Sequence, residues 1–353
     1  MNNSEKHESI AKDKNLFEII KSKIILKAIF NNIEYNIQLF IIRYNKSLQN
    51  KFGLLLSDYK EYSEKKDKII IEIIQPGADD SNCINHDTIE NFDEDDYEIS
   101  TYYKNGIKTI ELVIGDEIKT FEGLFKFCKY IEKVTFVQFY RDDITDMNYM
   151  FYGCSSLEEV CFKNKKSNFK TNNVTNMTHM FYGCSSLKKV DLSNIDTSSV
   201  IDMSSMFFDC SSLKEVNLSN LNNKNVINMN YMFHGCISLE KINLTNFKTE
   251  NVVQMKKMFN LCTSLEEIDL SSFDTSNVEN MNTMFGECEK LKYLDISNFV
   301  TKKLKNMYYM FYYCSSLEEL KFNIVDVDKS YRCRAFKGCK DSLKNKFETY
   351  NNE

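Results

Sequence analysis

A repeat constrains this sequence more than any other feature. The segment "MNYMFYGCSSLEEV", residues 147–160, recurs thirty residues later as "MTHMFYGCSSLKKV", residues 177–190. Alignment on Met-x-x-Met-Phe-x-x-Cys gives a first interval of 30 residues and then constant intervals of 26, with the cysteines at Cys154, Cys184, Cys210, Cys236, Cys262, Cys288 and Cys314. A fixed period of about 20 to 50 residues is the signature of stacked repeats, because one unit cannot bury its apolar face alone.

Two atypical segments extend the array. Upstream, "FEGLFKFC" (residues 121–128) places Phe, Leu, Phe and Cys in the Met, Met, Phe and Cys positions. Downstream, "RCRAFKGC" (residues 332–339) supplies Cys333, Phe336 and Cys339. The sequence thus predicts about nine repeats, with the atypical ones at the ends, as expected for units that cap a stack.

The first half of each repeat has the spacing of a short helix. Met203, Met206, Phe207 and Cys210 lie at i, i+3, i+4 and i+7, which would place them on one face of two helical turns. The residue before the first Met is nearly always Asp or Asn, both strong N-caps. These predicted caps are Asp146, Asn176, Asp202, Asn228, Gln254, Asn280 and Asn306.

The second half of each repeat has the pattern of a short strand. It reads Leu-x-x-Val-x-Leu, as in Leu213, Val216 and Leu218, where apolar and polar positions alternate. The pattern therefore predicts an α/β solenoid: a right-handed coil with one short parallel strand and one short helix per 26-residue repeat.

The combination of motifs resembles a known family. "LxxVxL" is the strand signature of leucine-rich repeats, and "MFxxCSSLxxVxLSNFxTxxVxxM" resembles the BspA-like leucine-rich repeat in its 26-residue surface-protein form. The resemblance covers roughly residues 109–343 and implies a right-handed solenoid with a parallel sheet along one face. Bacterial members are often secreted or lipid-anchored adhesins, and protist members form large families. This sequence lacks the export signal of the secreted members.

The regular cysteines are predicted to pack in the core, because free Cys is among the most buried residue types. Metal binding needs ligands that converge on one point, whereas these cysteines are 26 residues apart and the four histidines occupy unrelated positions. No cofactor or metal is expected. Disulfides between coils remain an alternative under oxidising conditions. The candidates are Cys161 and Cys333, which lie outside the regular cysteine position of the repeat. Cys83 is expected to be exposed.

The polar strand positions predict an outward face. The position before the strand Val alternates in charge from repeat to repeat, which allows pairing between coils. Concave solenoid faces are also the usual binding surfaces of such folds. The candidate partner-binding residues on this face are Glu215, Lys241, Glu267, Asp269, Tyr293 and Asp295. The aspartates beside Tyr293 suggest a basic partner.

The rest of the chain divides into two regions before the solenoid of residues 99–353. Residues 1–75 predict a small, mainly helical region that ends in a strand, "KIIIEII". Residues 76–98 read as an acidic linker. Within residues 16–60, "IILKAIFNNI" and "IIRYNKSLQ" distantly resemble an F-box, without its Leu-Pro start and its Trp. The competing interpretation is a helical cap on the first repeat.

Composition and the absence of known motifs argue against several classes of function. The net charge of −6 gives no electrostatic footprint for nucleic acid. The N-terminus resembles neither a signal peptide nor a membrane span, so we expect a cytoplasmic and monomeric protein. No phosphate-binding loop or catalytic grouping is recognisable, which predicts a non-enzymatic module that binds a protein partner. Two alternatives stay open: a cell-surface adhesin exported by an unconventional route, and an F-box-like substrate adaptor of a ubiquitin ligase.

Overall fold

The computed structural model describes residues 69–75, 97–104, 107–115, 118–139, 141–162, 169, 171–322 and 334–349. The chain divides into two compact units, Met1–Asp67 and Lys68–Glu353, and every described residue belongs to the second. The helices and F-box-like segment expected within residues 16–60, most of the acidic linker, Cys83 and Cys333 lie outside the described residues.

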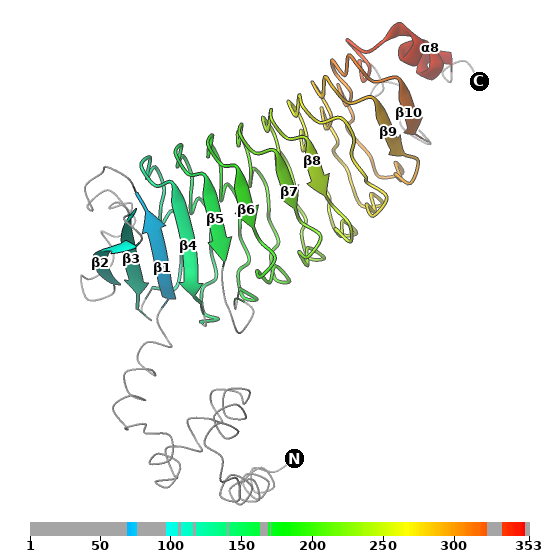
Figure 1. Cartoon of the computed structure of the whole chain (residues 1–353). Coiled ribbons are helices and arrows are strands. Elements are labelled where there is room, and N and C mark those ends of the chain that lie inside the picture. The colour runs from blue at the N-terminus through cyan, green and yellow to red at the C-terminus, as the bar shows by residue number, and fades with distance from the viewer. Residues whose placement is uncertain are drawn as a thin grey trace, which may run out of the picture. The chain divides into compact units, whose positions relative to one another are not determined.

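The second unit is a β-solenoid whose coils stack along the chain (Figure 1). Each short strand pairs in parallel with that of a neighbouring coil, in the pairs β4–β5, β5–β6, β7–β8 and β9–β10. The expected short parallel strands are therefore confirmed, although the equivalent residues 267–269 form no strand. The strands are β4 (Lys133–Gln138), β5 (Glu159–Phe162), β6 (Lys189–Asp191), β7 (Glu215–Asn217), β8 (Lys241–Asn243), β9 (Tyr293–Ile296) and β10 (Glu319–Phe322).

Different elements close the two ends of the stack. Strand β1 (Ile69–Ile74), predicted from its isoleucines, pairs antiparallel with both β3 (Ile107–Ile114) and β4, and β2 (Tyr97–Lys104) adds to β3. These strands form one sheet in the order β2-β3-β1-β4-β5-β6. At the other end lies α8 (Asp341–Thr349), which buries Leu343 in the common core.

The helix predicted in each repeat is absent, so the α/β class is wrong. Residues 203–210 form successive tight turns, and α8 is the only α-helix in the described part of the chain. Ser205 and Asp209 have φ values of 55° and 53°, which no right-handed helix contains. The position of Ser205 repeats this left-handed conformation in Tyr149, His179, Tyr231, Lys257, Thr283 and Tyr309.

Hydrogen bonding explains why turns replace the helix. The N–H groups of Met203, Ser205, Phe207 and Asp209 donate to carbonyls of the next coil, at 2.7 to 3.1 Å. The N–H groups of Met206, Phe208 and Cys210 donate within the turns instead, to the carbonyls of Met203, Ser205 and Phe207 at 3.2 to 3.4 Å. Two successive turns with a left-handed third residue give the same i, i+3, i+4, i+7 spacing of inward side chains as a helix. The predicted burial is therefore right and the predicted backbone wrong.

The residues predicted as N-caps cap turns instead. Asp202 Oδ1 accepts the backbone N–H of Ser204 at 2.7 Å, and Asn228 Oδ1 accepts that of Asn230 at 3.1 Å. This is the local bond by which Asp and Asn stabilise a turn. The preference of these residues for capping is expressed, but the element that they begin is a turn.

The inward Met, Phe and Cys side chains form continuous columns. Every Met, Phe and Cys of the seven regular motifs is buried, with at most 1% of its surface exposed. The phenylalanines from Phe125 to Phe336 stack nearly parallel from coil to coil, with ring centroids 5.2 to 5.9 Å apart. These columns make the core one uninterrupted stack.

The cysteines pack in the core as predicted, and they also donate hydrogen bonds. The Cys236 thiol donates to the carbonyl of Phe207 in the preceding coil at 3.1 Å, and Cys154, Cys184, Cys210, Cys262, Cys288, Cys314 and Cys339 repeat this bond at 2.8 to 3.2 Å. Burial raises the pKa of these thiols, to about 12 for Cys288. All ten described cysteines, Cys161 included, are buried and free of disulfides.

The left-handed turn predicts an unusual effect of glycine. Glu287 has a φ of 60°, and glycine already occupies its position in three other repeats, at Gly153, Gly183 and Gly235. Glu287→Gly should therefore raise the free energy of unfolding by about 0.5 to 1 kcal/mol, measured by urea denaturation. Glu289→Gly, two residues on and without a positive φ, is the control and should give no gain. Destabilisation by Glu287→Gly would indicate a helix.

The thiol bond predicts an order among substitutions of Cys236. Cys236→Ala removes the donor and leaves a small void, and should cost about 1 to 2 kcal/mol of unfolding free energy. Cys236→Ser should cost less, because its hydroxyl can donate to the same carbonyl of Phe207. The measurement is the urea midpoint of both variants, repeated at Cys262. If Ser were the more damaging residue at both positions, the thiol would act only as an apolar filler.

Candidate interaction surfaces

The predicted polar face lies on the strands, as the alternation requires. Val216 is buried between exposed Glu215 and exposed Asn217, and Glu215 pairs in register with Lys241 of the next strand. Glu267 and Tyr293 occupy the same position in the following coils and are also exposed. These four candidates therefore form one outward column.

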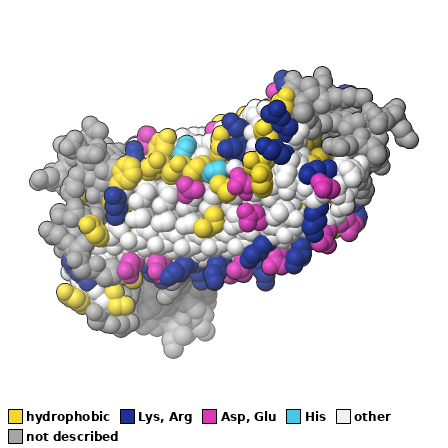
Figure 2. All heavy atoms as spheres, turned by 90° about the horizontal axis from the view of Figure 1, so that it is seen from above, with side chains coloured by type: hydrophobic (Ala, Val, Ile, Leu, Met, Phe, Trp, Pro, Cys, Tyr) yellow, Lys and Arg dark blue, Asp and Glu magenta, His cyan; other side chains and the backbone are white. Residues whose placement is uncertain are grey.

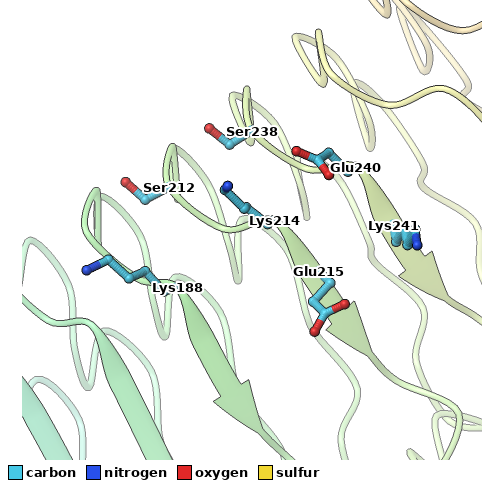
Figure 3. Close-up of a pocket in the computed structure, with 7 residues that line it drawn as sticks. All are labelled: Lys188, Ser212, Lys214, Glu215, Ser238, Glu240 and Lys241. Carbon is cyan, nitrogen blue, oxygen red and sulfur yellow. The ribbon is translucent and has the colours of Figure 1, made fainter.

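A groove of about 640 Å³ runs beside this column (Figure 3). Glu215 and Lys241 line it together with Lys188, Ser212, Lys214, Ser238 and Glu240. Its three lysines face two glutamates, and Lys188 already donates to Glu158 at 2.6 Å. The groove is therefore polar and nearly balanced in charge.

The two candidate aspartates have partners within the solenoid. Asp269 accepts the N–H of Ser271 at 2.9 Å, and Asp295 accepts that of Ser297 at 3.1 Å. Asp295 also accepts from the Tyr293 hydroxyl at 3.2 Å and lies 3.5 Å from the Lys321 ammonium. The hydrogen bonds from Ser297, with smaller contributions from Tyr293 and Lys321, lower the pKa of Asp295 to about 2. Both carboxylates thus stabilise turns, whatever else they contact.

A second surface, which sequence reasoning missed, lies on the turn segments. Hydrophobic side chains and histidines gather there in a row, separate from the row of alternating charges (Figure 2). We call this row the aromatic stripe, and it consists of Phe127, Tyr149, Tyr152, His179, Tyr182, Phe208, Tyr231 and His234. Phe127 is 56% exposed, and the other seven are half-buried by one another.

The rings of the stripe stack from coil to coil. Tyr152 and Tyr182 have centroids 4.7 Å apart, and Tyr182 and Phe208 lie 4.3 Å apart with ring planes within 5° of parallel. Tyr149 stacks on His179 at 4.8 Å in a parallel column. Because stacking covers the faces of the inner rings, the stripe presents mainly their edges outward.

Lysines lie at both ends of the stripe. The Lys126 ammonium lies 5.2 to 5.7 Å from the ring centroids of Phe127, Tyr149 and Tyr152. At the other end, Lys256 and Lys257 lie 5.4 and 5.8 Å from the Tyr231 ring. At these distances a cation–π attraction holds the ammonium groups close to the aromatic surface.

The two histidines are held neutral within the stripe. Nδ1 of His179 and of His234 is buried and has no hydrogen-bond partner within the described part of the chain. Burial, reinforced by the nearby charge of Lys257 and opposed by a bond with Asn260, lowers the pKa of His234 to about 4. Burial also lowers the pKa of His179, against the opposing charge of Asp202.

A signal for the stripe was present in the sequence. The variable positions of "MNYMFYGC", "MTHMFYGC", "MSSMFFDC" and "MNYMFHGC" are rich in Tyr, His and Phe. In a helix, these positions would scatter around the outer surface. In the stacked turns each position forms its own column, so aromatic residues 26 or 30 residues apart come into contact.

Neither a metal-binding group nor a membrane-spanning helix is found within the described ranges. No group of three or more His, Cys, Asp or Glu side chains there could hold a metal ion. No described helix has the length and apolar character needed to cross a bilayer.

His234 predicts a pH effect on stability. Between pH 6.5 and about 4 the unfolded chain binds a proton at His234 that the folded chain does not, so the unfolding free energy should fall as pH decreases through this window. For a half-buried ring the effect is on the order of 1 kcal/mol. His234→Phe, which copies Phe208 of the same column, should lose less stability than the wild type between pH 7 and pH 5 in urea denaturation. Tyr182→Phe is the control, and an unchanged pH dependence in His234→Phe would contradict the assignment.

Comparison with known proteins places the repeats in a family. No curated protein and no solved structure matches the chain. Two segments, residues 119–242 and 238–348, match the model of a family described as "Mycoplasma protein of unknown function, DUF285". Together they cover well over half of the chain and run from the first atypical repeat into α8. The chain therefore belongs to this DUF285 family.

Proposed function

We propose that the solenoid is a non-enzymatic module that binds a protein partner through the aromatic stripe. The stripe is the observation that carries the proposal. Tyr and Phe are enriched at the centres of protein interfaces and often dominate their binding energy, whereas Lys and Glu are depleted there. A contiguous aromatic row on a surface otherwise rich in charge is the mark of an interaction site.

The stacking geometry favours a protein over a carbohydrate. A sugar ring packs on the exposed face of an aromatic ring, but the faces of Tyr152, Tyr182 and Phe208 are turned toward one another. Ring edges and hydroxyl groups remain available, and these suit the side chains and main chain of a polypeptide.

The rest of the surface supports a binding role rather than catalysis. The groove beside Glu215 and Lys241 is open and lined by lysines, glutamates and serines that are exposed or half-buried. Catalytic sites usually enclose their substrate and exclude water, which such a groove does not favour. The ten free, buried thiols are the state expected in the reducing cytosol, which supports the proposed cytoplasmic location. We also propose that the repeats are related to the BspA-like leucine-rich repeat, which their "MFxxCSSLxxVxL" motif resembles.

The repeats themselves supply variants that test the stripe. Tyr149→Ser with Tyr231→Ser copies Ser205 of the same column, and Tyr152→Asn with Tyr182→Asn copies Asn260. Because the fold already accepts these residues at equivalent positions, the variants should stay folded. Glu215→Lys with Lys241→Glu is the matched control on the predicted strand face.

We expect a partner captured by the wild-type protein from its source cells to be lost with either stripe variant and kept with the strand-face variant. The measurement is affinity purification with quantitative mass spectrometry, after circular dichroism has shown that all baits are folded. Retention by both stripe variants, with loss by the strand-face variant, would move the binding site to Glu215, Lys241 and their neighbours.

A further inference from the structure

The charges around the aromatic stripe indicate what kind of segment it binds, an inference that rests on the proposed function. Several lysines near the strand face have carboxylate partners in the neighbouring coil, as in Lys188–Glu158 at 2.6 Å, Lys340–Glu318 at 2.6 Å and Lys292–Glu266 at 3.7 Å. Lys126, Lys256 and Lys257 have no carboxylate partner among the described residues and lie instead over stripe rings. Positive charge therefore remains available at both ends of the stripe.

The ring edges reinforce this preference. An aromatic ring carries partial negative charge on its faces and partial positive charge at its edge. Since stacking covers the faces of Tyr152, Tyr182 and Phe208, the surface between the lysines is lined by positive edges. Such a surface favours carbonyl and carboxylate oxygens over cations.

The middle of the stripe carries a negative charge, in contrast to its ends. Asp209 is exposed next to Phe208, and its carboxylate has no side-chain hydrogen bond or ion pair among the described residues. It lies against Gly235 of the next coil, where a Cβ would come within 2.0 Å of its Oδ1. A second carboxylate placed here would be repelled, whereas an N–H or O–H group would find an acceptor.

The length of the stripe sets the distance that a bound segment must span between Lys126 at one end and Lys256 at the other. Five coil steps separate the motif of Lys126 from that of Lys256. At about 4.8 Å per step this is about 24 Å. An extended polypeptide rises about 3.3 Å per residue, so about seven residues would span it.

We propose that the partner docks on the stripe as an extended segment with two acidic residues about seven positions apart and a neutral, apolar or hydrogen-bond-donating middle. One acidic side chain meets Lys126, the other meets Lys256 and Lys257, and a central donor bonds Asp209. Apolar side chains between them pack against the ring edges.

A displayed library of random twelve-residue peptides tests this inference. The library is selected on the full-length wild-type protein and counter-selected on Tyr152→Asn with Tyr182→Asn. Peptides that depend on the stripe should be enriched in Asp or Glu at two positions about seven apart and depleted of acidic residues midway. Stripe-dependent peptides without acidic residues, or with Lys or Arg at those positions, would overturn the acidic segment while leaving the stripe as a binding site. If no peptide distinguishes the two proteins, both this inference and the proposed function fail for linear segments.

A charge swap then tests the end contact. Lys126→Glu should weaken the binding of a selected acidic peptide about threefold to tenfold, measured by fluorescence anisotropy at low salt. The same peptide with Lys in place of its terminal acidic residue should recover affinity for Lys126→Glu. Lys188→Glu, which lies off the stripe, should leave binding unchanged. Equal effects of Lys126→Glu and Lys188→Glu would mean that only net charge matters, and would overturn the assigned contact.

Discussion

The solenoid depends on hydrogen bonds between coils at the turn segments. Alternate N–H groups, such as those of Ser205, Phe207 and Asp209, donate to the next coil rather than to their own. A single repeat would leave these donors without protein partners in a region that also holds its Phe and Cys core. Because an unpaired buried amide is costly, the repeats are stable only as a stack. The Phe207 carbonyl illustrates the constraint, since it accepts both the N–H of Cys210 and the thiol of Cys236.

The same stacking creates both surfaces. Outward side chains at equivalent positions of successive repeats form a column, because these positions lie one coil apart along the solenoid. On the strands, opposite charges meet in neighbouring coils, as in Lys133 of β4 and Glu159 of β5. On the turns, Tyr152, Tyr182 and Phe208 stack into one strip. The aromatic stripe ends where Asn260 and Gly286 occupy the position of Tyr152, Tyr182 and Phe208 in the repeat. Substitutions in an otherwise constant motif therefore decide where the stripe begins and ends.

The repeat pattern predicted which side chains point into the core, but it did not predict the backbone conformation of the turn segments. The spacing of Met203, Met206, Phe207 and Cys210 identified four buried side chains correctly. It could not distinguish a helix from two turns, because both point these positions the same way. What differs is the hydrogen-bond partner, which lies 25 residues away in the next coil. The left-handed Ser205 and Asp209 carried little local signal, since only the glycines of sister repeats hint at a positive φ.

The sequence by itself determined the period, the buried columns and the alternation of the short strands, because these follow from which side chains avoid water. Only the tertiary structure decided that the turns bond to their neighbours, that each thiol donates to a Phe carbonyl, and that Tyr, His and Phe side chains of separate repeats form one stripe. Those features depend on distances between residues 25 to 33 positions apart, and such distances are fixed only when one coil is stacked on the next.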